Sequence, residues 1–188
     1  IGINWLLAPV VDVNNNPANP VINLRAWGET AETVTQLTQA FLRGANRYPV
    51  LTAAKHFPGH GDTATDSHLE LPIILHDRAR LETVELAPFR AAMAAGVDAV
   101  MTAHLKLPLW DAENPATFSR AIVTGLLRQE LGFDGLIVTD ALVMGAIIHH
   151  YGANEAAVLA VEAGADILMM PSDPEGAILA ICAAVESG

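Results

Sequence analysis

The residues best suited to chemistry gather in one polar segment, residues 55–72, which reads Lys-His-Phe-Pro-Gly-His-Gly-Asp-Thr-Ala-Thr-Asp-Ser-His-Leu-Glu-Leu-Pro. It holds three histidines, two aspartates and a lysine, and its glycines and Pro58 argue against a helix. A short apolar run, residues 50–54, comes directly before it. Because α/β proteins place catalytic groups on polar loops at the ends of buried strands, this segment is the first candidate for an active site.

Within this segment, Asp66 and His68 are two positions apart. Alternate residues of an extended chain point the same way, so the carboxylate and the imidazole are able to face each other. A neighbouring carboxylate favours the imidazolium and orients the ring, which suits a general acid/base. The alternative is that the pair only ties the loop together.

Asp140 follows the apolar residues 136–139. An ionised carboxylate at the end of a buried strand is costly unless it is paired or used. Its functional roles would be nucleophile, base or metal ligand, and the alternative is to cap the next helix.

Three further side chains are candidates for binding. Lys55 and His56, at a strand end, supply donors for hydroxyl groups or an anion, unless Lys55 simply pairs with Asp12 or Asp140. Arg25, in an earlier loop, either binds substrate or braces that loop.

His104 follows the next apolar run, and it either joins the site or is a hydrogen-bonded core histidine. With His60, His68 and nearby aspartates it would offer ligands to zinc or iron. Barrel metallohydrolases often carry His-x-His at the first strand end, a pattern that this chain does not contain, and Asp66 is better placed to serve His68. We therefore expect no metal and no cofactor.

The elements that position these residues follow from the apolar runs and the capping residues. Runs bounded by turn residues predict strands, whereas apolar residues at helical spacing behind an acidic or hydroxyl cap predict helices. The predicted strands are 4–13, 50–54, 97–103, 136–139 and 166–170, and the predicted helices are 29–47, 77–95, 119–131, 154–163 and 173–186.

Strict strand–helix alternation is compatible with a doubly wound sheet or a (β/α)8 barrel. No Gly-x-Gly-x-x-Gly follows the first strand, and polar residues end nearly every strand, as at the rim of a barrel. We predict an α/β protein of the TIM-type (β/α)8 barrel class. Since eight strands close such a barrel, the five predicted here form its C-terminal units, and about three units are expected upstream of Ile1.

The composition narrows the possible partners. The 188 residues form one domain with 52% hydrophobic and 5% aromatic residues, and a formal charge of −11 argues against nucleic-acid binding. No apolar run is long enough to span a membrane, and no signal peptide is visible, which favours the cytoplasm, although the chain opens at Ile1. The single cysteine, Cys182, excludes an internal disulfide, and its apolar neighbours predict that it is buried.

The polar segment closely resembles the signature of family 3 glycoside hydrolases of the β-N-acetylglucosaminidase type, through Lys-His-Phe-Pro-Gly-His-Gly-Asp, Asp-Ser-His and Leu-Pro. Other segments resemble the family along almost the whole chain. They are residues 8–13 (Ala-Pro-Val-Val-Asp-Val), 85–89 (Glu-Leu-Ala-Pro-Phe), 101–104 (Met-Thr-Ala-His), 131–135 (Leu-Gly-Phe-Asp-Gly) and 138–142 (Val-Thr-Asp-Ala-Leu).

The resemblance implies a retaining exo-β-N-acetylglucosaminidase that acts on terminal GlcNAc of peptidoglycan or chitin fragments. Asp140 would be the nucleophile, and His68, paired with Asp66, the acid/base. This differs from the usual pair of carboxyl groups, because an imidazole replaces one of them. A phosphorylase that uses the same nucleophile with phosphate instead of water is the alternative enzyme.

The resemblance further implies that Arg25, Lys55 and His56 bind hydroxyl groups of the sugar. This chain departs from the family pattern at Leu24 and at Ala141, where several relatives have a small or polar residue and a second Asp. The family's Asp-x-Glu-Gly-Gly-type segment is absent from the sequence. We therefore expect the chain to require an upstream barrel segment, and a catalytically incomplete partial barrel is the competing interpretation.

Overall fold

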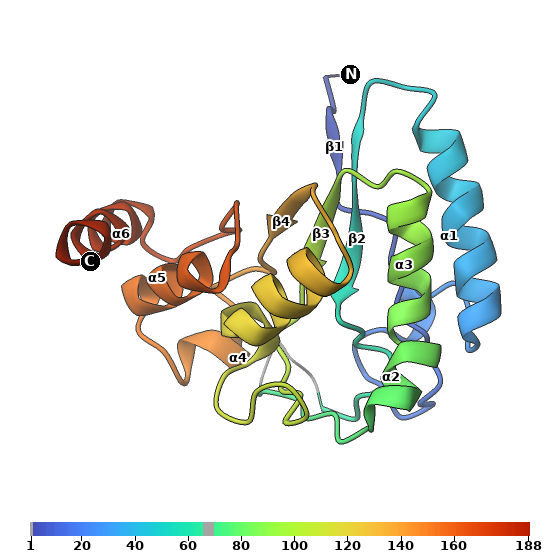
Figure 1. Cartoon of the computed structure of the whole chain (residues 1–188), viewed down its shortest axis with the longest axis horizontal. Helices are drawn as coiled ribbons and strands as arrows, with labels where there is room; N and C mark the ends of the chain where they lie inside the picture. Colours follow the sequence, from blue (N-terminus) through green and yellow to red (C-terminus); the bar gives the residue numbers. More distant parts are fainter. Residues whose placement is uncertain (1, 66–69) are drawn as a thin grey trace.

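The computed structural model describes residues 2–65 and 70–188 (Figure 1). Its strands alternate with helices along the chain, which confirms the α/β class. In chain order the elements are β1 (Trp5–Leu6), the 3-10 helix η1 (Asn23–Arg25), α1 (Ala31–Ala45), β2 (Leu51–Phe57), α2 (Arg78–Thr83), α3 (Leu86–Ala94), β3 (Ala99–Thr102), the 3-10 helix η2 (Ala116–Phe118), the π-helix η3 (Ala121–Glu130), β4 (Leu136–Val138), α4 (Gly145–Ile148), α5 (Ala153–Ala163) and α6 (Pro174–Ser187).

The four strands form a parallel sheet in the order β1-β2-β3-β4. The fifth predicted strand, 166–170, is reduced to one parallel bridge between Ile167 and Val138. Within the described residues the sheet is not closed, as expected when fewer than eight strands are present. All strands run in the same direction, so their carboxyl ends lie at one edge (Figure 1).

The predicted strand 4–13 is regular only over β1, and the chain then follows β2 irregularly. The N–H of Lys55 donates to the carbonyl of Pro9, and the N–H of Val11 donates to the carbonyl of Lys55. Pro9 has no N–H, so a regular ladder cannot continue through it. The irregular segment still brings Asp12 beside the end of β2.

The single helix predicted over 77–95 is wrong, because the structure divides it into α2 and α3. Pro88 lacks an N–H, and its ring conflicts with the carbonyl four residues earlier, at Val84. A continuous helix therefore breaks near Val84. The predicted cap is confirmed, since Asp77 Oδ1 accepts the N–H of Arg80 at 2.8 Å.

Helices α1 and α3 pack side by side against the sheet, whereas α5 and α6 lie at its far end (Figure 1). Phe57 of β2 and Phe89 of α3 meet edge to face in the core, with ring centroids 5.2 Å apart. Helix α6 packs against α5 and presents most of its surface to solvent, with Ala177 buried. The predicted burial of Cys182 is therefore wrong, since this residue is exposed. Within the described part of the chain, no helix is both long and apolar enough to cross a membrane.

Candidate active site

The carboxyl edge of the sheet gathers most of the predicted site residues. Strand β2 continues to Phe57, beyond the predicted end at residue 54, so Lys55 and His56 lie on the strand itself. Asp140 and His104 each lie two residues beyond their strands, β4 and β3. A strand holds side chains more rigidly than a loop, so Lys55 and His56 have fixed directions at this edge.

Arg25, His56 and Asp12 form a hydrogen-bonded chain. Arg25 Nη2 lies 3.1 Å from His56 Nε2, and His56 Nδ1 lies 2.7 Å from Asp12 Oδ2. A guanidinium only donates, so Nε2 is the acceptor, and Nδ1 carries the proton that it donates to Asp12. His56 thus has both ring nitrogens engaged, one of them with Arg25, and its predicted contact with a sugar hydroxyl stays a prediction.

Asp12 is the buried end of this chain, with 1% of its surface exposed. Its carboxylate also accepts the backbone N–H of His56 at 3.2 Å and that of His60 at 2.7 Å. Burial by itself raises the pKa of Asp12, but the two histidines and these hydrogen bonds outweigh it and hold the pKa below its ordinary value. Sequence reasoning offered Asp12 as a partner for Lys55, whereas its carboxylate is hydrogen-bonded to His56 and His60.

Lys55 is the half-buried cation beside this chain. Burial lowers its pKa, as does the charge of Arg25, whereas the charges of Asp140 and Asp12 oppose that shift. The charges of Arg25 and Asp140 thus both reach Lys55 at this edge of the sheet. Asp140 Oδ1 accepts the backbone N–H of Ala141 at 2.8 Å. A carboxylate within electrostatic reach of a lysine is able to act as a nucleophile.

His104 is fully buried, and both of its ring nitrogens are hydrogen-bonded. Nε2 lies 3.1 Å from the carbonyl of Ala141, and Nδ1 lies 2.8 Å from Thr117 Oγ1. Burial lowers the pKa of His104 despite the opposing charge of Asp140, so the ring stays neutral. The structure thus favours the hydrogen-bonded core histidine, and its contact with Ala141 holds the residue next to Asp140.

Replacing His104 with phenylalanine is expected to lower stability by about 1–3 kcal/mol, because the buried Thr117 hydroxyl and the Ala141 carbonyl each lose a partner. Activity is expected to fall about tenfold as the Asp140 turn loosens. Denaturant unfolding and steady-state kinetics measure the two effects. Thr117→Val is the control, because it leaves the Ala141 contact in place and should affect stability more than turnover. Wild-type kcat in His104→Phe would show that this contact does not hold Asp140.

The predicted dyad, Asp66 and His68, lies outside the described residues, and its geometry stays a prediction. His60 of the same segment is buried, and its Nδ1 lies 2.8 Å from Thr63 Oγ1. Sequence reasoning did not single out Asn19, whose amide donates to the carbonyls of His60 and Gly61 at 2.8 and 2.9 Å. The asparagine-rich turn before it was a composition signal but gave no indication of this long-range contact.

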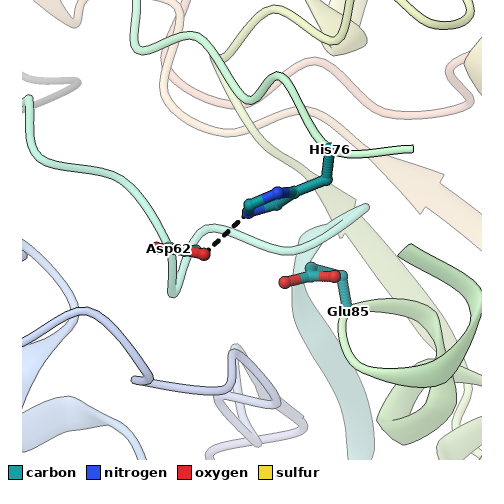
Figure 2. Close-up of side chains that lie close together, drawn as sticks. All are labelled: Asp62, His76 and Glu85. Carbon is teal, nitrogen blue, oxygen red and sulfur yellow. Dashed lines mark hydrogen bonds and ion pairs between the residues drawn. The ribbon is translucent and has the colours of Figure 1, made fainter. Parts of the chain in front are cut away.

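Among the described residues, the group of side chains close enough to hold a metal ion is Asp62, His76 and Glu85 (Figure 2). Asp62 is one of the aspartates that the sequence offered as ligands beside the histidines, whereas His76 and Glu85 were not offered. Arg80 Nη2 contacts both carboxylates, at 3.2 Å from Asp62 and 3.1 Å from Glu85. Because a guanidinium already pairs with both carboxylates, the arrangement favours an ion-pair cluster over a cation site.

A family model, a curated relative and a solved structure all match this chain over most or all of its length. The model of the glycosyl hydrolase family 3 N-terminal domain matches residues 1–188. Beta-hexosaminidase A of Pseudoalteromonas piscicida is 43% identical over 183 residues, which cover 91% of this chain and 31% of that protein. The solved structure of a glycoside hydrolase family 3 beta-N-acetylglucosaminidase from Paenibacillus sp. str. FPU-7 superposes with a TM-score of 0.96 at 53% identity, over 100% of this chain and 36% of that one.

A beta-glucoside phosphorylase, BglX, also superposes, with a TM-score of 0.94 at 29% identity, over 100% of this chain and 36% of that chain. The chain thus spans roughly a third of the length of these three proteins. The superpositions identify the open parallel sheet as part of a TIM-type barrel domain.

Proposed function

Because the chain belongs to glycosyl hydrolase family 3, we propose that it supplies the catalytic edge of a retaining exo-β-N-acetylglucosaminidase. The substrate is a saccharide with a terminal, non-reducing β-GlcNAc, of the kind that peptidoglycan and chitin fragments provide. The observation that carries the proposal is that Asp140, Lys55 and the His56–Arg25 pair lie at the carboxyl ends of parallel strands. That edge is where barrel enzymes place their catalytic groups.

In the proposed first step, a carboxylate oxygen of Asp140 attacks the anomeric carbon, and the bond from that carbon to the leaving oxygen breaks. His68, paired with Asp66, gives its proton to the leaving oxygen. The product is a glycosyl ester on Asp140, and the configuration at the anomeric carbon is inverted once.

In the second step a water attacks the same carbon, and His68 takes the proton from that water. The ester bond to Asp140 breaks, so the second inversion restores the original configuration. Arg25, oriented by His56, and Lys55 are proposed to hold hydroxyl groups of the sugar at the edge of the sheet. Their cationic donors suit the oxygen atoms that the ring presents.

The phosphorylase alternative has the likeness to BglX in its favour. There phosphate would replace water in the second step and leave a sugar 1-phosphate. A histidine acid/base tolerates an anionic acceptor better than a carboxylate does, since an imidazole is neutral or cationic.

We also propose that further β/α units upstream complete the barrel. The open sheet leaves large apolar side chains exposed near its first edge, including Ile3 and Leu51. A parallel sheet is normally covered on both faces and has no free edge in a closed barrel. In the competing interpretation, residues 1–188 are a partial barrel without activity of their own.

The test is product analysis with an aryl β-N-acetylglucosaminide. We expect release of GlcNAc with the β configuration as the first product by NMR, at a rate that does not depend on phosphate. Phosphate-dependent formation of GlcNAc 1-phosphate would replace the hydrolase proposal with the phosphorylase. Turnover by residues 1–188 alone would contradict the requirement for upstream units.

A further inference from the structure

Two segments that carry the family resemblance meet away from the sugar-binding residues. Asp62 is the last residue of the run Lys-His-Phe-Pro-Gly-His-Gly-Asp, residues 55–62. Glu85 is the first residue of the segment 85–89. Figure 2 shows the two carboxylates on either side of the space that the His76 ring faces. His76 Nε2 lies 2.7 Å from Asp62 Oδ2, and Arg80 Nη2 bridges Asp62 and Glu85.

This cluster is anchored in the core rather than on the surface. Glu85 is 3% exposed, and burial raises its pKa against the opposing charge of Arg80. Gly59, at the start of the polar segment, lies directly against it, because a Cβ on Gly59 would be only 2.8 Å from Glu85 Cβ. Gly59 also has a φ of +130°, which glycine alone adopts readily. The beginning of the polar segment is thus fixed in position against the start of α3.

The cluster also joins two positions that flank the predicted acid/base pair. Asp62 and His76 are 14 positions apart, and the residues between them include Asp66 and His68 in the sequence. Joining two positions of a chain restricts the conformations open to the residues between them. Arg80 of α2 and Glu85 beside α3 hold this junction against the body of the domain.

We propose that Asp62, His76, Arg80 and Glu85 form a clasp that positions the loop bearing the acid/base pair. These are positioning residues, since none of them contacts Asp140, Lys55 or Arg25 in the described structure. The inference rests on the proposed function, in which His68 protonates the leaving oxygen. Loosening the clasp should therefore weaken proton donation while leaving sugar binding and nucleophilic attack intact.

The test uses aryl and alkyl β-N-acetylglucosaminides whose leaving groups differ in acidity. A poor leaving group needs the proton, whereas 2,4-dinitrophenolate departs without one. In Asp62→Ala we expect kcat/KM to fall about 10²-fold for the alkyl substrate and less than about threefold for the dinitrophenyl substrate. His76→Ala should give the same pattern, and His76→Gln, which keeps a donor toward Asp62, should restore most of the rate.

Glu82→Gln is the matched control. Glu82 lies on α2 and forms ion pairs with Arg78 and Arg90, so its replacement removes a carboxylate and leaves the clasp intact. We expect wild-type kinetics for both substrates. Thermal unfolding of each variant confirms that it is folded before its kinetics are compared.

His68→Ala separates failure of the clasp from failure of the proposed function. If His68 is the acid, kcat/KM of this variant should depend steeply on the acidity of the leaving group. If His68→Ala shows that dependence while Asp62→Ala and His76→Ala lose rate equally for both substrates, the clasp is only structural and the inference is wrong. If His68→Ala itself shows no such dependence, the proposed function is wrong, and the clasp inference with it.

Discussion

Replacing Asp140 with alanine is expected to reduce kcat for an aryl β-N-acetylglucosaminide by at least about 10⁴-fold, with no new metal or cofactor requirement. The physical reason is that the side chain to be removed would form the bond to the anomeric carbon. Lys55, whose charge Asp140 influences, is a donor and is unable to replace it as a nucleophile. Steady-state kinetics on the folded variant measure the loss.

Adding azide as an external nucleophile tests specifically whether Asp140 is the nucleophile. In Asp140→Ala a small anion is able to occupy the space of the missing carboxylate and attack the anomeric carbon, releasing the aryl oxide. The product expected is the α-glycosyl azide, whose configuration shows attack on the face that Asp140 would use. His68→Ala should instead give the β-glycosyl azide, because there azide attacks the glycosyl ester in place of water.

The matched control for this variant is Asp134→Asn. Asp134 is exposed and precedes β4, whereas Asp140 follows the other end of that strand. It should keep wild-type kcat. Turnover in Asp140→Ala within about tenfold of the wild type would contradict the nucleophile assignment.

The alternation of strands and helices was predictable because each element carries its own local signal. Buried strands are apolar runs, and three helix starts have a capping side chain where one was expected, at Asp77, Ser119 and Asp173. The break between α2 and α3 also has a local signal in the sequence. Pro88 was visible in the sequence, but the hydrophobic periodicity on either side of it suggested a continuous helix.

Pairing across long sequence distances was not predictable from local patterns. His56 and Asp12 are 44 positions apart, and only the path of the chain beside β2 brings them together. The local apolar pattern also gave a wrong prediction of burial for Cys182. Burial depends on whether another element covers that face of α6. The sequence therefore indicated which residue types stand at the strand ends, whereas the structure was needed to assign their partners.

The contacts of His56 and Lys55 change the interpretation of the site. From sequence, His56 and Lys55 were equivalent sugar-binding donors on one loop. In the structure His56 is 4% exposed and linked to Asp12 and Arg25, while Lys55 is half-buried within the influence of Asp140. The two neighbours thus have separate tasks, and the register of β2 against β3 shifts between Lys55 and Phe57. One orients an arginine, and the other presents its own charge.

The second large effect is expected when the hydrogen-bonded chain of Asp12, His56 and Arg25 is broken at Asp12. Asp12→Ala is expected to lower the free energy of unfolding by about 3–5 kcal/mol, since it leaves buried donors of His56 and His60 without their acceptor. The pKa of Asp12 is lowered in the folded protein, so its stabilising contribution is present above the ordinary aspartate pKa and is lost as the pH falls through the folded value. The stability difference between wild type and variant should accordingly shrink in acid.

Asp12→Asn tests the orientation of the ring with a side chain of the same shape. If its amide faces Nδ1, that nitrogen becomes the acceptor, and the proton moves to Nε2, which then cannot accept from Arg25. We expect KM to rise about tenfold with a smaller change in kcat, because Arg25 is proposed to bind the sugar. Nitrogen NMR of His56 reports the tautomer directly. An unchanged tautomer and an unchanged KM in a folded Asp12→Asn protein would contradict the role of this chain in presenting Arg25.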